Sequence, residues 1–530
     1  MVEVGCLTIR KVSGMISNQQ RKRAAVIGAG PGGLAAAMLL SGQGYEVDVY
    51  EKQPVIGGRS ARLELGEYRF DRGATFLMMP GLLEEMFDIV GRNLSDYVDL
   101  KELTPLYALN FGDKVFTPSR NREDTAAQIK ELFPGNEDNY LRFMQDEEVK
   151  FGKVMPLLRR PFGKLTDYLR KDAVTALPKL DVNNTVYGIL SRYFTDERLR
   201  WAFTFQSKYL GMSAWDCPGT FTILSFIEHH YGLFHPIGGV NRVFQAMADI
   251  VKEYGGRIHT SCPVKQVIVR NGRAEGLLLE NGERIEADHV VVNADFAHAV
   301  NHLFEPGVLK KYTPEKMKRK KYSCSTAMLY LGVDGEIDLP HHSIYFPEDY
   351  RLNVDEITKH KVLSADPSLY IHNPSKLDST LAPAGKSALY VLMPSPNLTG
   401  DIDWDVEREN VREVMMQRLE AIPELADIRS RIEESMMFTP LDWENELDVY
   451  RGATFNMAHN LGQMMYLRPH NQFEELKGVW LVGGGTHPGS GLPTIFESAR
   501  ISVRLIQEED AKTRSNRSPY VKTAEAGGHS

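Results

Sequence analysis

A glycine-rich turn near the N-terminus constrains this chain more than any other feature. An apolar run over residues 24–27 leads into Gly28-x-Gly30-x-x-Gly33, and a second apolar run ends at Glu51. Gly28 permits a tight strand-to-helix turn, Gly30 lets the backbone approach a pyrophosphate, and Gly33 lets the helix pack closely on the sheet. Glu51 follows Gly33 by 18 residues, which suits a hydrogen bond to a ribose hydroxyl. The pattern predicts a βαβ unit that binds a dinucleotide at the helix N-terminus.

The composition is that of a large folded protein. The chain has 530 residues, of which 42% are apolar and 25% charged, enough for two or three domains or one large interleaved unit. Its net charge of −8 argues against nucleic acid as a partner. The four cysteines form no C-x-x-C pair, which favours reduced cysteines over a zinc site or a disulfide framework.

Residues 24–42 form an uncharged stretch of 19 residues, long enough for a membrane span by hydropathy alone. The glycines and Pro31 at its start instead favour a buried strand and helix. The first 23 residues are polar and lack the apolar segment of a signal peptide, so we expect a cytoplasmic protein. The polar tail from residue 509 is predicted to be disordered.

A second glycine pair follows the first motif closely. Gly57-Gly58-Arg59 and then Phe70-Asp71-Arg72-Gly73 come soon after Glu51. Glycine permits close approach of the backbone to a ligand, and an arginine can pair with phosphate. We therefore predict that Gly58 and Arg59 contact the same dinucleotide.

A third glycine cluster lies about 450 residues further on, directly after the apolar run 479–482. It reads G-G-G-T-H-P-G-S-G-L-P over residues 483–493, and a helical pattern follows. Pro493 suits the first turn of a helix, whose free N–H groups and dipole favour negative charge. A reduced flavin carries such a charge, so this cluster is predicted to face a flavin and favour its reduction.

The histidines give weaker signals. His487, inside the third cluster, is a candidate proton carrier, although a histidine in a glycine loop is more often a spacer bonded to the backbone. His229, His230 and His235 are close in sequence, but only Glu228 adds a carboxylate at a plausible ligand spacing. We expect a buried or pocket-lining segment there and predict no metal site.

Seven motifs occur in an order that resembles the bacterial-type carotenoid desaturases, a family that also includes terminal-methyl carotenoid oxygenases. The resemblance covers roughly residues 22–510, and the C-terminal cluster is its most specific part. The motifs are the N-terminal fingerprint, Gly57–Arg59, Phe70–Gly73, His235–Gly239, Tyr322–Ser325, Arg468–Asn471 and Val482–Gly489.

The resemblance implies FAD as the cofactor, a long apolar polyene as the substrate and peripheral attachment to the cytoplasmic membrane. Carried over by position, Val264 would reach the adenine region and the start of the last helix would face the flavin. The cofactor-binding residues so assigned are Gly28, Gly30, Gly33, Glu51, Gly58, Arg59, Val264, Gly484, Gly485, Pro493 and Thr494. No catalytic acid or base is assigned beyond His487, and the oligomeric state is left open.

The expected fold is α/β, an amine-oxidase-like flavoprotein with a Rossmann-type FAD-binding domain and an interleaved α+β domain for substrate and membrane. The boundaries between the pieces of these two domains follow from two patterns. Apolar runs typical of strands occur within residues 257–295 and 326–440, and helical patterns cover about 120–225. The predicted FAD-binding pieces are 23–115, 231–325 and 441–508. The substrate pieces are the helical 116–230 and the mixed 326–440, with an N-terminal extension over 1–22 and a tail over 509–530.

Two features suggest how an apolar substrate would be met. The basic and apolar residues of 150–171 are what a segment at a membrane surface requires, whereas the basic run 310–321 is more simply a solvated face. Aromatic residues of the middle region are candidate walls of a substrate tunnel, with ordinary core packing as the alternative. These are Phe203, Phe205, Tyr209, Phe221, Phe226, Tyr231 and Phe234.

Four functions, three enzymatic and one not, fit these motifs to different degrees. A FAD-dependent desaturase that passes hydride to the flavin fits best, and a terminal-methyl oxygenase is the nearest alternative, because the loop 483–493 is somewhat closer to that branch. A flavin amine oxidase lacks support from anionic anchors in the sequence. A non-enzymatic lipid-binding protein of the GDP-dissociation-inhibitor type would not need the full third glycine cluster.

Overall fold

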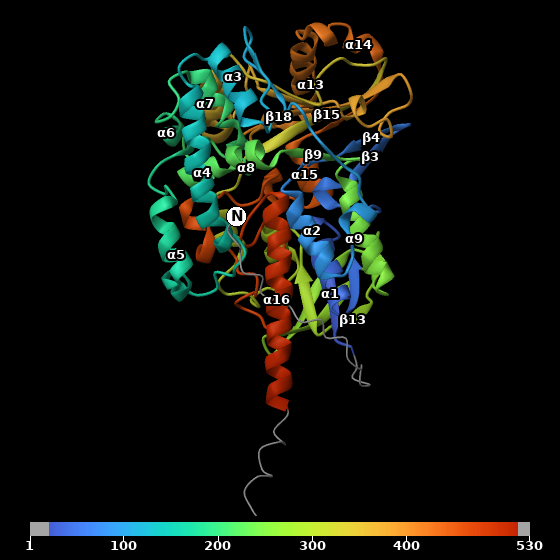
Figure 1. The fold of residues 1–530 in the computed structure, drawn as a ribbon. Coiled ribbons are helices and arrows are strands. Elements are labelled where there is room, and N and C mark those ends of the chain that lie inside the picture. The colour runs from blue at the N-terminus through green and yellow to red at the C-terminus, as the bar shows by residue number, and fades with distance from the viewer. Residues whose placement is uncertain (1–20, 518–530) are drawn as a thin grey trace, which may run out of the picture.

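A five-stranded parallel sheet forms the base of the molecule in the computed structural model, which describes residues 21–517 (Figure 1). Its strand order is β10-β2-β1-β14-β20, and all neighbours are parallel. The strands come from three distant parts of the chain, as predicted for a discontinuous domain. They are β1 (Arg23–Ile27), β2 (Glu46–Tyr50), β10 (Arg257–His259), β14 (His289–Val292) and β20 (Val479–Leu481).

Each face of this sheet is covered. Helices α1 (Pro31–Gly42), α9 (Asn241–Glu253) and α16 (Leu492–Arg517) share one apolar core with it. An antiparallel sheet of β11 (Val264–Arg270), β12 (Arg273–Leu279) and β13 (Arg284–Glu286) covers the other face. The uncharged stretch 24–42 is thus β1 and the buried helix α1, as predicted. Among the described residues, no helix combines the length and apolar composition needed to cross a bilayer.

A seven-stranded sheet forms the upper part of Figure 1, with strand order β19-β15-β18-β17-β16-β7-β8. Helix α13 (Trp404–Glu420) packs on it. The predicted domain boundary at residue 115 is wrong, because β7 and β8 pair with this sheet and not with the parallel one. The strands are β7 (Ala108–Asn110), β8 (Val115–Phe116), β15 (Ser325–Asp334), β16 (His342–Tyr345), β17 (Leu369–His372), β18 (Lys386–Ser395) and β19 (Ile432–Phe438).

A helical layer lies along one side of both sheets, on the left in Figure 1. It confirms the helical character predicted for residues 120–225. The aromatic core of this layer includes the buried side chains of Phe203, Phe205 and Phe226, so these candidate wall residues serve as core residues. Its main helices are α3 (Arg122–Leu132), α4 (Glu137–Leu158), α5 (Lys171–Ala176), α6 (Val186–Leu190), α7 (Glu197–Ala202) and α8 (Ile223–Tyr231).

A small three-stranded sheet, β5-β9-β6, joins the helical layer to the rest. Its strands are β5 (Leu77–Met78), β9 (Leu233–Pro236) and β6 (Leu100–Glu102).

The C-terminal helix is longer than predicted. Helix α16 continues to Arg517, so the expectation of disorder from residue 509 is wrong as far as that residue. Asp510 explains the extension, because its buried carboxylate accepts hydrogen bonds from His289 and from the Tyr45 hydroxyl. The rest of the predicted tail, and most of the predicted N-terminal extension, lie outside the described residues.

Candidate functional site

The three glycine motifs meet around one cavity of about 760 Å³ at the carboxyl ends of the parallel strands. Ligands of open α/β sheets bind at this edge, and the volume is that of a cofactor site. Of the predicted residues, the cavity is lined by Gly28, Gly30, Glu51, Gly58, Arg59, Val264, Gly484 and Gly485.

The N-terminal turn has the backbone shape that its glycines predict. Gly28 has a φ of +92°, a left-handed value that favours glycine. A Cβ atom on Gly33 would lie 2.1 Å from the Gly28 carbonyl oxygen, so Gly33 serves the packing of helix on strand and does not line the cavity. Gly30 is the N-cap of α1, and no side chain at that position bonds to the first turn. The N–H groups of the first turn of α1 are therefore available to a phosphate.

Glu51 is held at the end of β2. One carboxylate oxygen accepts a hydrogen bond from the Ala29 N–H at 2.7 Å, and the other accepts from the Gln53 N–H at 2.9 Å. Burial raises the pKa of Glu51, and these backbone donors oppose that effect. Each oxygen keeps a second lone pair, so the carboxylate can still accept a bond from a ribose hydroxyl.

Arg59 lines the cavity but already has protein partners. Its guanidinium pairs with Asp295 at 2.7 Å and donates to the Thr454 carbonyl at 2.8 Å and to the Asn456 side chain at 3.1 Å. The predicted pairing with phosphate would therefore share this arginine with Asp295.

The Phe70–Gly73 motif acts outside the cavity, at the start of α9. Asp71 is buried and accepts hydrogen bonds from the N–H groups of Val240 and Asn241, where α9 begins. Burial raises the pKa of Asp71 to about 6, and the two N–H donors oppose the rise. A Cβ atom on Gly239 would lie 2.9 Å from this carboxylate. The motif thus fixes a helix start, and Asp71 is not among the residues that line the cavity.

Asn293 is a site residue that sequence reasoning missed. It follows β14, lines the cavity and donates from its side chain to the Gly28 carbonyl at 3.2 Å. A Cβ atom on Gly32 would lie 2.7 Å from the Asn293 side-chain oxygen and 2.9 Å from the Gly483 nitrogen. The first and third glycine motifs are therefore in contact, with Asn293 between them. Its position after an apolar parallel strand was the available signal.

The third glycine motif is closely packed. Cβ atoms on Gly484 and Gly485 would lie 2.5 Å from Asn456 and 2.8 Å from Phe296. Helix α16 begins at Leu492, and Leu492 and Ile495 line the cavity.

The predicted contacts of Pro493 and Thr494 differ from the structure, because neither residue lines the cavity. The hydroxyl of Thr494 instead donates back to loop carbonyls, including that of Ser490 at 2.7 Å. The helix N-terminus still faces the cavity, through the residues on either side of this pair.

His487 does not line the cavity either. Its Nε2 donates to the Arg160 carbonyl at 2.8 Å, and burial lowers its pKa to about 4. This geometry agrees with the spacer alternative and gives no contact for proton transfer in the cavity.

Arg468 is a second residue whose role the sequence did not reveal. It is fully buried, and its guanidinium donates to the carbonyls of Gly484 at 2.6 Å and Thr486 at 3.1 Å. It also donates to the Met457 and Gln463 carbonyls. Burial lowers the pKa of Arg468 to about 10. The charge therefore holds the third glycine loop in place from the side away from the cavity.

The three neighbouring histidines do not meet. His229 lies near the hydroxyls of Tyr107 and Tyr140, and His230 lies against Arg122 at 2.8 Å. His235 points elsewhere and lies 3.0 Å from Asp378. The predicted buried character holds for His229 and His235, whereas His230 is partly exposed.

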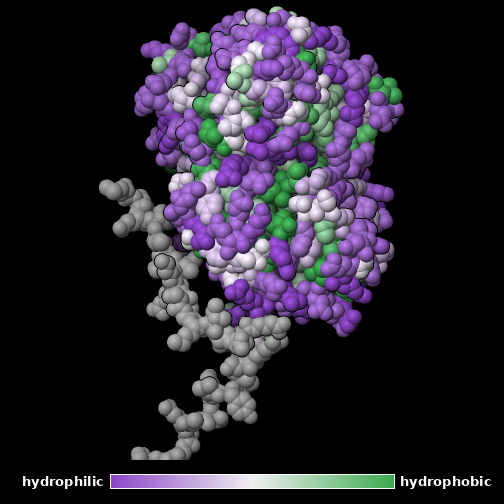
Figure 2. Space-filling view, turned by 90° about the vertical axis from the view of Figure 1, so that its right-hand side faces the viewer, coloured by the Kyte–Doolittle hydropathy of each residue, from purple (hydrophilic) through white to green (hydrophobic). Residues whose placement is uncertain are grey.

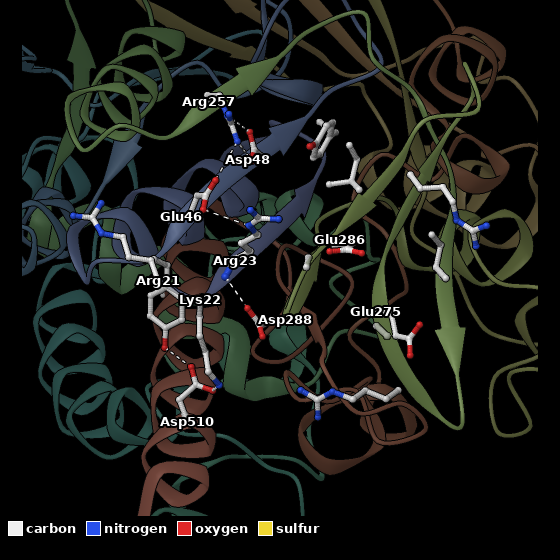
Figure 3. Close-up of a pocket in the computed structure, with 18 of the residues that line it drawn as sticks. Arg21, Lys22, Arg23, Glu46, Asp48, Arg257, Glu275, Glu286, Asp288 and Asp510 are labelled. Carbon is white, nitrogen blue, oxygen red and sulfur yellow. Dashed lines mark hydrogen bonds and ion pairs between the residues drawn. The ribbon is translucent and has the colours of Figure 1, made fainter. Parts of the chain in front are cut away.

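A larger groove of about 2,000 Å³ lies beside the outer end of the parallel sheet (Figure 3). Several of its charges are paired with each other: Arg257 with Asp48 at 2.7 Å, Arg23 with Glu46, and Lys22 with Asp510. It contains none of the glycine motifs and lies at the amino end of β1, where open α/β sheets do not bind their cofactors. The smaller cavity is therefore the candidate site.

The residues present fit a flavin dinucleotide. The first residues of two helices border the cavity, Pro31 of α1 with its cap Gly30 and Leu492 of α16, and glycines leave space for a ligand beside them. Glu51 and Val264 border the same cavity and would hold an adenosine there, and Gly484 and Gly485 border it as well.

Known proteins resemble this chain over most of its length. A family model for flavin containing amine oxidoreductases matches residues 31–507. The chain is 48% identical over 488 residues to a 4,4'-diapophytoene desaturase (4,4'-diapolycopene-forming) of Methylomonas sp., covering 92% of this chain and 96% of that protein. It is 37% identical to a zeta-carotene-forming phytoene desaturase of Myxococcus xanthus, covering 92% and 94%. Cyclohexylamine oxidase from Brevibacterium oxydans shares the fold, with a TM-score of 0.58 at 16% identity, covering 93% and 100%.

The chain therefore belongs to the flavin containing amine oxidoreductase family. Among its members it is a carotenoid desaturase-like flavoprotein with FAD as its cofactor, as the motifs predicted.

Proposed function

We propose that this protein is a FAD-dependent carotenoid desaturase that acts on a C30 polyene of the 4,4'-diapophytoene type. The observation that carries the proposal is the cavity in which both ends of the chain supply a helix N-terminus to one extended cofactor. The C30 substrate is favoured because the 48% identical relative acts on diapophytoene, whereas the C40 phytoene relative is 37% identical.

In such a reaction, the chain's own residues bind the cofactor and the substrate but do not accept the hydride. Bound FAD would supply the hydride acceptor for CH–CH groups. The α16 N-terminus at Leu492 would stabilise negative charge that develops at the adjacent end of the cavity. The protein must also exclude water and hold a hydrocarbon chain. Apolar side chains gather near the middle of the face in Figure 2, between the parts that contain the two large sheets, as an apolar substrate would require.

Product mass tests this function. The enzyme would be produced in cells that make colourless 4,4'-diapophytoene. The polyenes would then be extracted and their molecular masses measured by mass spectrometry. A loss of two hydrogens for each new double bond is expected. Gain of oxygen at a terminal methyl would identify the oxygenase alternative and overturn the desaturase proposal. An unchanged substrate beside FAD-loaded protein would overturn both.

We further propose that the protein attaches to the cytoplasmic membrane through residues 164–179. Leu165 and Leu169 have 66% and 76% of their surface exposed, and Val174 and Leu177 are also exposed. Exposed lysines lie beside them at 164, 171 and 179. Apolar side chains flanked by cations suit an anionic bilayer surface. Lys150, at the start of the predicted basic segment, is excluded, because it is buried between Glu147 and Asp181.

Vesicle flotation tests the attachment. The double variant Leu165→Glu, Leu169→Glu should bind vesicles of phosphatidylethanolamine and phosphatidylglycerol at least about tenfold more weakly, because two apolar side chains no longer enter the bilayer. Val406→Glu, at a position 67% exposed on α13, is the matched control and should bind as the wild type does. Equal binding by the double variant would exclude this segment.

A further inference from the structure

Three histidines far apart in the sequence meet in the interior, away from the cofactor cavity. His235 lies on β9, His341 directly precedes β16, and His372 ends β17. One ring nitrogen of each lies within 4.8 Å of the other two. The ring centroids are 4.8 Å apart for His235 and His341 and 4.7 Å apart for His341 and His372. None of the three lines the cavity described above.

Each ring has a nitrogen that lacks a hydrogen-bond partner among the described residues. These atoms are His235 Nδ1, His341 Nε2 and His372 Nε2, and all three are buried. A buried polar atom left unpaired is costly to the folded state, so three in one cluster need an explanation. A neutral imidazole carries a lone pair on its unprotonated nitrogen, which is the kind of atom that a metal ion binds.

Two of the rings are oriented by outer partners. His235 Nε2 donates to Asp378 at 3.0 Å, which leaves its Nδ1 as a lone pair. Asp378 is fixed in turn by the N–H groups of Gly238 at 2.6 Å and Thr380 at 3.0 Å. Histidine ligands of metals commonly donate their second nitrogen to a carboxylate in this way.

A second chain of hydrogen bonds orients His341. Its Nδ1 lies 3.1 Å from His342 Nε2, and His342 Nδ1 lies 2.6 Å from the Tyr370 hydroxyl, which contacts the Thr75 hydroxyl. If His341 donates from Nδ1 and His342 donates on to Tyr370, the lone pair of His341 stays on its unpartnered Nε2. The geometry thus allows all three unpaired nitrogens to be acceptors together.

We propose that His235, His341 and His372 form a binding site for one divalent transition-metal ion of the zinc type. Three imidazole nitrogens with an open fourth position are a known zinc ligand set. Tetrahedral ligands at about 2.1 Å stand about 3.4 Å apart, so the trio must close by about 1.4 Å or less. His341 is partly exposed and gives the ion a way in. The ion would join β9 to the seven-stranded sheet.

Metal titration of the FAD-loaded full-length protein tests the site. After dialysis against a chelator, the wild type should bind one Zn²⁺ per chain by calorimetry. Co²⁺ at the same site should give visible bands at longer wavelengths than the flavin. His372→Gln should weaken Zn²⁺ binding by more than about 100-fold, and Asp378→Asn by about 10- to 100-fold, because outer partners alone have effects of that size. His341→Gln, at the partly exposed position, serves as the second ligand variant if His372→Gln does not fold.

The matched control is His289→Gln, because His289 is a buried histidine paired with Asp510 outside the cluster. It should bind Zn²⁺ as the wild type does. A wild type that binds no more Zn²⁺ than His372→Gln or His341→Gln would overturn the site and leave the cluster as a hydrogen-bonded polar core. Flavin content and desaturation do not enter this readout, so the outcome is independent of the proposed function.

Discussion

The first and third glycine loops face the same cavity but keep their shapes by different means. In the N-terminal turn the backbone packs on itself, with Gly33 against the Gly28 carbonyl. In the C-terminal loop, buried side chains from outside the loop hold the backbone. Arg468 donates to the Gly484 carbonyl, and His459 accepts from the Ser490 N–H at 3.0 Å. The first loop thus combines packing inside its own motif with one hydrogen bond from Asn293, whereas the second is held by side chains from outside the loop.

The largest expected effect tests the backbone-held loop. Gly33→Ala would place a methyl group 2.1 Å from the Gly28 carbonyl, so β1 and α1 must separate. We expect a loss of about 4 kcal/mol or more in unfolding free energy and no retained FAD, measured by denaturant titration and flavin absorbance. The matched control is Gly152→Ala, a helical glycine with no atom within 4 Å of the added methyl group. If Gly33→Ala keeps FAD as the control does, the turn is not held by backbone contact.

The next effect tests the loop held by side chains. Arg468→Met would remove donors to four carbonyls and leave buried acceptors unpaired, for a loss of about 3 kcal/mol in unfolding free energy. Arg468→Lys keeps a charge and some of the donors, so its unfolding free energy should lie between those of Arg468→Met and the wild type. FAD should dissociate faster from both variants, as measured by the release of flavin fluorescence. Wild-type stability in Arg468→Met would show that the loop shape is local after all.

The smallest effect concerns pH. Burial lowers the pKa of His487 to about 4, below an unfolded value of about 6.5. The unfolded chain therefore binds more protons between these values, and stability falls as pH drops through that window. The wild type should lose about 2 kcal/mol between pH 7 and pH 5 through this group alone. In parallel denaturant titrations, the drop in unfolding free energy from pH 7 to pH 5 should be smaller for His487→Gln than for the wild type by the contribution of this group. Equal drops in the two proteins would contradict the lowered pKa of His487.

The sequence predicts best what is local. The unit β1–α1–β2 follows from one glycine pattern and two apolar runs, and the antiparallel strands β11 and β12 follow from alternation around Gly272. The short strands β7 and β8 were assigned to the wrong part, because β7 pairs with β16, more than 200 positions away, and β8 pairs with β7.

The roles of single buried side chains were predicted less well. Asn293 and Arg468 both lay in stretches that drew attention, but their contacts exist only in the folded molecule. The histidines at 235, 341 and 372 share no sequence motif, and only the pairing of β16 with β17 brings the last two together. Sequence proximity instead pointed to His229 and His230, which face other partners.

The order of strands in the parallel sheet has a consequence for biosynthesis. β1 leaves the ribosome long before β20, yet both belong to the sheet whose carboxyl edge borders the cavity. The cavity also needs Leu492 and Ile495 from the final helix. The cavity for FAD can therefore be complete only after β20 and the start of α16 have been made, and until then the apolar strand β1 lacks some of its partners. A chain truncated before β20 would carry the first glycine motif and still lack a complete cofactor site.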